Sequence, residues 1–169
     1  MIKIGVSKGR VADDAMLQLG KQGFIFQEKP ERQLWAVDES NSLELLFIKA
    51  QDVATYVDRG IVDLGLVGKD VLMEKDAEFV EILDTGIGQC KMVLAGPEGL
   101  GGWDTLASGK IRLASKYPKV TREYLERAKI KGEVTELQGS LELAPLMGLS
   151  DCIVDIVESG KTLEAHRLV

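Results

Sequence analysis

Short apolar runs alternate with helical patterns along almost the whole chain, and this order constrains the fold more than any other feature. Apolar runs bounded by turn residues predict strands at 2–6, 33–37, 43–48, 61–67, 79–84, 89–95, 111–114, 134–137 and 152–157. Helical periodicity falls between them, at 11–19, 50–58, 69–74 and 120–128, with further helix starts at 141 and 162. Strands connected through helices form mostly parallel sheets covered on both faces, so the sequence predicts an α/β fold.

The chain is long enough to form two small lobes, and its character changes near residue 88. It has 169 residues, and a loose stretch rich in glycine and proline occupies 96–102. We expect lobe I to comprise 1–88 plus 156–169 and lobe II to comprise 89–155. Such a double crossover at the hinge would place a ligand cleft between the lobes, where pockets are common.

The charge balance limits the classes of partner. A formal net charge of −6 argues against a general binder of nucleic acid or of membrane surfaces. It does not exclude a small polyanion as ligand, because cations gather near the predicted strand ends, at Lys8, Arg10, Arg32, Lys49, Lys69 and Lys116.

No pattern indicates export, membrane insertion or histidine-based chemistry. The N-terminus begins as a strand, and no apolar run approaches the roughly 20 residues that span a bilayer, so we expect a cytoplasmic protein. Cys90 and Cys152 have no metal-ligand spacing, which favours two reduced thiols. The only histidine, His166, lies near the C-terminal end, which argues against a histidine base.

The stretch 152–163 has the order strand, turn and helix start, which is how α/β proteins commonly hold phosphate. Its apolar run is interrupted by Asp155 and followed by turn residues Ser159, Gly160, Lys161 and Thr162. Gly160 would let the backbone approach an anion, and the acid suits a sugar diol or a metal ion. An ordinary strand-to-helix connection, with Ser159 or Thr162 as N-cap, is the alternative. A P-loop is excluded because Asp155 stands where that motif needs glycine.

Two turns in the first half of the chain carry cations at strand ends, where open α/β sheets bind ligands. The first turn contains Lys8, Gly9 and Arg10, and the second contains Gly68, Lys69 and Asp70. The alternatives are a solvated basic turn for the first and a helix N-cap for Asp70.

Two turns in the second half are similar. Ser115, Lys116 and Tyr117 place a cation beside a ring, a pair that suits a nucleotide base, although Tyr117 would equally serve as a core or hinge residue. Residues 139–142 form a turn that opens a helix, with Ser140 as the cap and Glu142 as a first-turn acid.

These motifs follow those of one family in collinear order. From Glu142 to Leu163 the sequence resembles the signature of ATP phosphoribosyltransferases, which catalyse the first step of histidine biosynthesis. The resemblance covers essentially the whole chain, with further matching segments at 7–10, 52–53, 68–70, 89–91, 115–117 and 139–145.

The resemblance implies a two-lobed fold like that of periplasmic binding proteins. It also implies that adenine N1 of ATP displaces pyrophosphate from C1 of phosphoribosyl pyrophosphate, with Mg²⁺ held through the substrates and not by direct side-chain ligation. Because the nucleophile belongs to the substrate, the protein would orient two polyanions and stabilise charge on the leaving group. A short-form catalytic subunit of this kind is expected to form a homodimer within a hetero-oligomer that contains a histidyl-tRNA-synthetase-like regulatory subunit.

Site residues carried over from the family fall into three groups. The catalytic contacts to pyrophosphate would be Arg10 and Arg32. Phosphoribosyl pyrophosphate would be held by Asp155, Glu158, Ser159, Gly160, Lys161 and Thr162, with Glu142 and Lys8 as helpers. ATP would be contacted by Lys69, Asp70, Ser115, Lys116 and Tyr117.

The sequence departs from the family in two places. Residues 165–167 read Ala-His-Arg where Ala-Asn-Gly is usual, and Ser159 replaces a common threonine while keeping the hydroxyl. Family members continue past the position of Val169 with a returning strand and helix, so we expect lobe I to lack these elements. A non-catalytic, two-lobed small-anion-binding protein and an inactive truncated subunit remain as alternatives.

Overall fold

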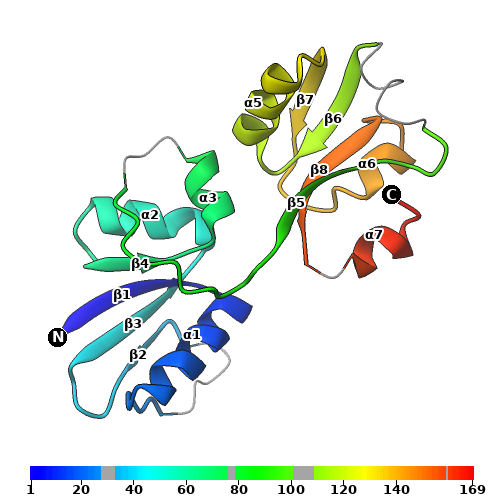
Figure 1. Ribbon diagram of the computed structural model, residues 1–169. Helices are drawn as coiled ribbons and strands as arrows, with labels where there is room; N and C mark the ends of the chain where they lie inside the picture. The colour runs from blue at the N-terminus through cyan, green and yellow to red at the C-terminus, as the bar shows by residue number, and fades with distance from the viewer. Residues whose placement is uncertain (28–32, 76–78, 101–108, 159) are drawn as a thin grey trace. The chain divides into compact units, whose positions relative to one another are not determined.

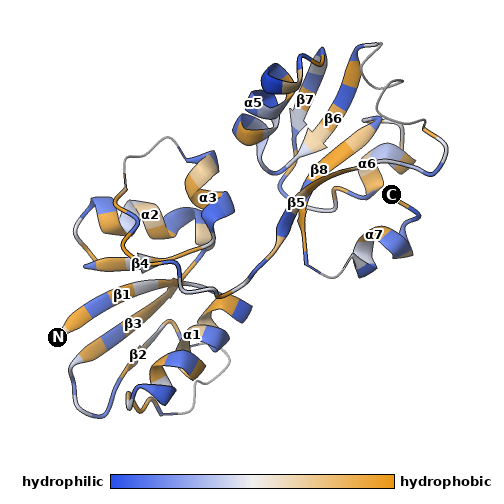
Figure 2. Ribbon diagram, in the orientation of Figure 1, coloured by the Kyte–Doolittle hydropathy of each residue, from blue (hydrophilic) through white to orange (hydrophobic). Residues whose placement is uncertain are grey.

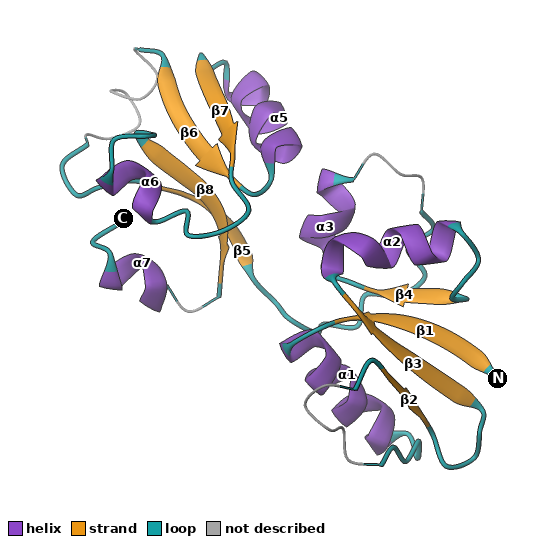
Figure 3. Cartoon of the chain, turned by 180° about the vertical axis from the view of Figure 1, so that it is seen from behind, coloured by secondary structure: helices purple, strands orange, loops and turns teal. Residues whose placement is uncertain are grey.

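The chain divides into two compact units, which we call unit 1 (Met1–Gln89) and unit 2 (Cys90–Val169). The computed structural model describes residues 1–27, 33–75, 79–100, 109–158 and 160–169 (Figure 1). Each unit contains a four-stranded sheet flanked by helices (Figure 3).

In unit 1 the elements follow one another as β1 (Ile2–Ser7), α1 (Arg10–Lys21), β2 (Trp35–Val37), β3 (Leu43–Ile48), α2 (Ala50–Asp58), β4 (Leu64–Leu66) and α3 (Lys69–Glu74). The strand order is β2-β3-β1-β4. Strand β1 pairs in parallel with β3 and β4, whereas β2 runs antiparallel to β3. The carboxyl ends of three strands therefore lie at one edge of the sheet.

Helices cover both faces of this sheet because successive strand residues point to opposite sides. On one face, α1 packs Ala12 and Ala15 into a core with Val6, Leu45 and Phe47. On the other face, α2 approaches β4 so closely that a Cβ at Gly65 would lie 2.9 Å from a Val53 methyl group. Glycine at that position therefore permits the close packing of α2 on the sheet.

Unit 2 is composed of β5 (Lys91–Ala95), β6 (Ile111–Ser115), α5 (Pro118–Ala128), β7 (Gly132–Glu136), α6 (Leu143–Leu146), β8 (Cys152–Val157) and α7 (Lys161–Ala165). The strand order is β5-β8-β6-β7. Strand β6 pairs in parallel with β7 and β8, and β5 runs antiparallel to β8.

Two hydrophobic clusters lie on opposite faces of the second sheet. Leu125 of α5 packs with Leu113 and Val154 on one face. The other face carries Ala95, Ala114 and Ile153, which pack with Leu141, Ala144 and Leu168. Figure 2 shows the contrast between a mainly hydrophobic β8 and a mainly hydrophilic α5.

The amino-terminal edge of the second sheet is fixed by an ion pair that the sequence did not indicate. Arg112 Nη2 lies 2.7 Å from Asp151 Oδ1, and Arg112 Nη1 donates to the Gly148 carbonyl at 2.8 Å. The Arg112 guanidinium lowers the pKa of Asp151 below its usual range. Next to it, burial raises the pKa of the Cys152 thiol to about 11, whereas Cys90 is exposed.

Most expected elements are present with small shifts in their ends. The predicted β2–β3 hairpin is confirmed, and α2, α3 and β8 have the predicted bounds. Helix α1 continues past Gly20, and β4 is shorter than predicted. The strand predicted at 79–84 is wrong: Val80 and Ile82 are 88% and 73% exposed, and the described part of this segment has no ladder partner.

The predicted return of residues 156–169 to the first lobe is corrected by the structure. These residues belong to unit 2, and the division between units lies between Gln89 and Cys90. Val169 exchanges two backbone hydrogen bonds with Gly96, of 2.8 and 2.9 Å, and Leu168 is buried. No helix in the described part of the chain is long and apolar enough to cross a membrane.

Candidate functional site

The predicted phosphate-binding turn connects β8 to α7 in unit 2. Strand β8 ends at Val157 and α7 begins at Lys161, so the connection has the expected strand–turn–helix order. Gly160 has a left-handed φ of 78°, which disfavours side-chain-bearing residues. The first N–H groups of a helix lack intrahelical partners, and Lys161 and Thr162 are exposed there. Ser159 lies outside the described residues.

Asp155 is placed at the edge of the sheet, just beyond the end of β6. Ser115, the last residue of β6, pairs with Val154, and Asp155 pairs with Val93 of β5. By strand alternation Asp155 lies on the same face as Ile153, the face on which α6 and α7 pack. Its Oδ1 accepts a hydrogen bond of 2.8 Å from the Ile156 N–H. The carboxylate is half-buried and precedes an exposed Glu158.

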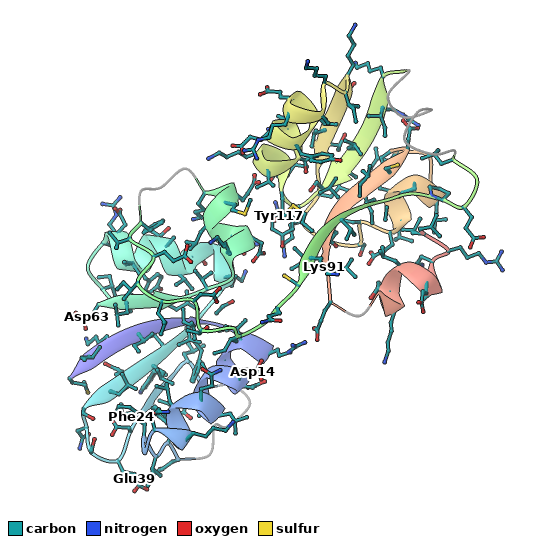
Figure 4. The ribbon with its side chains drawn as sticks, in the orientation of Figure 1. Asp14, Phe24, Glu39, Asp63, Lys91 and Tyr117 are labelled. Carbon is teal, nitrogen blue, oxygen red and sulfur yellow. The ribbon has the colours of Figure 1, made fainter. Side chains whose placement is uncertain are left out.

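The neighbouring turn after β6 is built from buried groups. Ser115 Oγ donates a 2.7 Å hydrogen bond to the Val154 carbonyl and accepts one of 2.9 Å from the Tyr117 N–H. Tyr117 is only 4% exposed, and its carbonyl accepts a hydrogen bond from Thr121 Oγ1 within α5. Figure 4 labels this tyrosine in unit 2. The core interpretation of Tyr117 therefore fits, and Lys116 is the more accessible residue of the turn.

The turn at 139–142 differs from its prediction. Ser140 adopts a positive φ of 53°, and α6 begins only at Leu143, without a side-chain cap. The Ser140 carbonyl accepts a hydrogen bond from the Leu143 N–H at 3.2 Å, so the serine acts through its backbone. Glu142 is half-buried at the start of α6, and its helper role stays a prediction.

In unit 1, the ends of β1 and β4 carry exposed cations at the carboxyl edge. Gly9 separates Lys8 from Arg10 and has φ 86° and ψ −147°, a conformation essentially restricted to glycine. Arg10 Nε lies 3.6 Å from Asp14 Oδ2 on the next turn of α1, where Figure 4 labels Asp14. The two side chains are 55% and 39% exposed, so this ion pair adds little to stability.

The turn after β4 places Lys69 and Asp70 at the start of α3. Gly68, not Asp70, is the N-cap residue, so the N-cap interpretation of Asp70 is wrong. The Asp70 carboxylate lies over Gly68, so a side chain at that position would displace it. Lys69 Nζ forms an exposed ion pair of 3.1 Å with Glu81. Arg32, the second predicted catalytic arginine, lies outside the described residues.

Unit 1 also contains a hollow of about 410 Å³ that the sequence did not indicate. It is lined by Lys8, Leu34, Trp35, Glu44, Leu46, Phe47, Ile48, Lys49, Asp52 and Tyr56. Part of this lining could have been inferred from the sequence, because Asp52 and Tyr56 are one helical turn apart on α2 and therefore lie on the same face of the helix.

The possible metal ligands in the described part of the chain are scattered. Among the described residues no three His, Cys, Asp or Glu side chains are grouped so that they could hold a metal. Mg²⁺ prefers near-octahedral oxygen ligands and often takes them from substrate phosphates and water. That Mg²⁺ arrives bound to the substrates stays a prediction.

Comparisons with known proteins connect this chain to one family of sequences. The family model for ATP phosphoribosyltransferase matches residues 49–169. An ATP phosphoribosyltransferase from Methylococcus capsulatus is 43% identical over 171 residues, with 99% of this chain and 78% of the relative covered. One from Clostridium kluyveri is 42% identical, with 99% and 77% covered.

Solved structures agree with these sequences. The ATP phosphoribosyltransferase HisG:HisZ complex from Thermotoga maritima matches with a TM-score of 0.81 at 36% identity, covering 100% of this chain and 80% of that one. A substrate-binding domain of a putative amino acid ABC transporter from Streptococcus pneumoniae matches with a TM-score of 0.50 at 13% identity, covering 100% and 78%. The latter likeness concerns the fold alone and supports the predicted fold like that of periplasmic binding proteins.

Proposed function

The chain belongs to the ATP phosphoribosyltransferase family, and we propose that its β8–α7 turn holds the phosphoribosyl substrate of this reaction. The enzyme transfers a phosphoribosyl group from phosphoribosyl pyrophosphate to N1 of ATP, which yields phosphoribosyl-ATP and pyrophosphate in the first step of histidine biosynthesis. The observation that carries the site assignment is the left-handed Gly160 between a carboxylate-bearing strand end and a helix start.

The residues of this turn suit the two ends of a ribose phosphate. Backbone N–H groups around Gly160 and the Thr162 hydroxyl are donors, which the 5-phosphate requires. The Asp155 carboxylate accepts hydrogen bonds only, so it suits the ribose hydroxyls. The remaining proposed contacts to phosphoribosyl pyrophosphate come from Glu158, Ser159, Lys161, Glu142 and Lys8.

The leaving group needs positive charge that is present before the bond breaks. Pyrophosphate gains negative charge as C1 is transferred to adenine N1, and fixed cations stabilise that charge. Arg10 is exposed at the start of α1, where a bidentate guanidinium would pair with phosphate oxygens, and Arg32 would act with it. Mg²⁺, when bound to the substrate phosphates, would neutralise part of the same charge.

A regulatory subunit is the second part of the proposal. The Thermotoga maritima neighbour is a complex of HisG with HisZ, and this chain matches its fold along its whole length. We expect this protein to assemble with a subunit of the same type, and as a homodimer. The proposed ATP contacts are Lys69, Asp70, Lys116 and the turn that contains Ser115 and Tyr117.

The test combines the protein with ATP, phosphoribosyl pyrophosphate and Mg²⁺, with and without a HisZ-type subunit. We expect product absorbance and pyrophosphate release to increase together, and to require both substrates and the metal. Binding of both substrates without turnover in either mixture would contradict catalysis and favour the non-catalytic alternative.

A further inference from the structure

Lys91 begins β5 and lies on the face of the second sheet that carries Asp155. In the antiparallel pair of β5 and β8, Lys91 lies opposite Val157, and Val93 lies opposite Asp155. Residues directly opposite each other share a face, so Lys91 and Asp155 are diagonal neighbours on one face. Such neighbours lie about 7–8 Å apart, within reach of a long side chain. Figure 4 labels Lys91 on β5.

The turn at Gly160 and helix α7 belong to the same face. Leu163 of α7 packs against the hydrophobic cluster that contains Ala95 and Ile153. These two residues pair with each other and form the next pair on the face that carries Asp155. The lysine, the carboxylate and the proposed phosphate-binding turn therefore share one face of the sheet.

The charge of Lys91 has no partner in the described part of the chain. Lys69 and Lys110 form ion pairs with Glu81 and Glu133, whereas no carboxylate of the described residues lies at ion-pair distance from Lys91. Its side chain is also exposed. Lys91 can therefore neutralise a bound anion without breaking an existing ion pair.

A cation is needed at this turn because two acids already lie beside it. Asp155 and Glu158 precede Gly160 in the sequence, and a phosphate monoester carries about 1.5 to 2 negative charges at pH 7. Neutral N–H donors bind such an anion but leave its repulsion by nearby carboxylates in place. An ammonium group offsets that repulsion and forms stronger, charge-assisted hydrogen bonds.

We propose that Lys91 binds the 5-phosphate of phosphoribosyl pyrophosphate together with the turn at Gly160. The 5-phosphate is favoured over the pyrophosphate because Lys91 lies level with Val157, the last residue of β8 before the turn. The proposal rests on the proposed function, which supplies the substrate. The alternative role for a lysine on an edge strand such as β5 is to prevent pairing with another chain, and that role needs no ligand.

Calorimetry with three ligands tests which anion Lys91 binds. The protein is titrated without ATP, in the presence of Mg²⁺, with phosphoribosyl pyrophosphate, ribose 5-phosphate or inorganic pyrophosphate. Lys91→Met removes the charge, and the Kd should rise about tenfold for the first two ligands and less than about twofold for pyrophosphate. Lys91→Arg keeps the charge, and its Kd values should stay within about threefold of the parent.

Lys131→Met is the matched charge control. Lys131 is exposed and directly precedes β7, at the opposite edge of the same sheet, so its loss should change none of these Kd values. In steady-state kinetics, Lys91→Met should raise the KM for phosphoribosyl pyrophosphate about tenfold and leave kcat and the KM for ATP near parental values. The reason is that the 5-phosphate keeps its charge while C1 reacts. Loss of edge protection alone would move none of these constants.

Several outcomes would overturn the proposal. Equal affinity of the parent and Lys91→Met for ribose 5-phosphate would do so, as would a loss confined to pyrophosphate. If the parent turns over in either case, Lys91 alone is rejected and the enzymatic function stands. If the parent binds ribose 5-phosphate through Lys91 but does not turn over, the enzymatic function is rejected and the phosphate contact stands. Thermal unfolding verifies the fold of each variant, and Lys91→Gln repeats the comparison with a second neutral side chain.

Discussion

Units 1 and 2 share one sheet plan but present different chemistry at the carboxyl edge. Each sheet has three parallel strands and one antiparallel edge strand, in the orders β2-β3-β1-β4 and β5-β8-β6-β7. In unit 1 the edge carries exposed cations such as Lys8 and Arg10. In unit 2 the side chains of Ser115 and Tyr117 are buried, and the more accessible groups are Lys116 and the turn at Gly160. The same plan thus supports recognition by charge in unit 1 and by backbone shape in unit 2.

The largest expected effect tests the charged edge. Arg10→Ala should lower kcat by about 100- to 1,000-fold, because removing one preorganised group from developing charge has effects of this size. Folding should be unaffected, since the side chain is 55% exposed. Steady-state kinetics with pyrophosphate detection measures the loss.

Asp14→Asn is the matched control for that change, because it removes the ion-pair partner and keeps the guanidinium. Its kcat should stay within about threefold of the parent, since exposed ion pairs contribute little. Equal turnover by the parent and Arg10→Ala would show that charge on the leaving group is stabilised elsewhere.

The second-largest expected effect tests the turn at Gly160, at the carboxyl edge of the unit 2 sheet. Gly160→Val forces a β-branched residue into φ 78°, which costs about 1–2 kcal/mol or more, although no neighbour lies within 4 Å of an added Cβ. The KM for phosphoribosyl pyrophosphate should rise about tenfold, and the KM for ATP should change much less. Gly109→Ala, at an equally open glycine without positive φ, should change neither constant. A Gly160→Val enzyme with parental KM values would remove the turn from the site.

The third effect concerns the buried support of unit 2. Ser115→Ala deprives the Tyr117 N–H and the Val154 carbonyl of their hydroxyl partner, which should lower the free energy of unfolding by about 1–3 kcal/mol. Hydrogen exchange should become faster in β6, β8 and α5 and stay unchanged in unit 1. Uniform acceleration across both units would mean that they unfold as one cooperative body.

The smallest effect is a pH dependence at the opposite edge of unit 2. Because Arg112 lowers the pKa of Asp151 in the folded state, the carboxylate stabilises the fold fully above its unfolded pKa of about 4, and the stabilisation is lost as pH falls through the lower folded pKa. Asp151→Asn should flatten this part of the stability curve and lower stability near neutral pH by about 1 kcal/mol. Denaturant unfolding at several pH values measures both, and identical slopes for parent and variant below pH 4 would contradict the assignment.

Local order was predictable from the sequence because it depends on neighbouring residues. Helices α2 and α3 and strand β8 have their predicted bounds, and the strand–turn–helix order around Gly160 was evident from residue types alone. The site proposal for Gly160 rests on the same kind of local pattern, whereas the catalytic role of Arg10 comes from the resemblance to the family. These patterns report the secondary structure that a segment prefers. The prediction was correct where the folded protein also gives that segment a neighbouring strand or helix to pack against.

Long-range choices were not predictable in the same way. The alternation at 79–84 predicts a strand, but a strand needs a neighbour, and the structure gives the described residues of this segment none. Apolar periodicity likewise does not say which sheet a segment joins, so the bonds between Val169 and Gly96 were unexpected. Tyr117 and Trp35 show the same limit, because ring burial depends on tertiary packing.

The unequal environments of the two cysteines make the chain a ready substrate for site-selective labelling. Alkylating reagents attack the thiolate, and Cys152 is both enclosed and held protonated at neutral pH by its pKa of about 11. A maleimide dye should therefore attach at exposed Cys90, the first residue after the division between units. With a second dye on either unit, energy transfer would then report whether the distance between Cys90 and that dye changes during turnover, without any cysteine being removed.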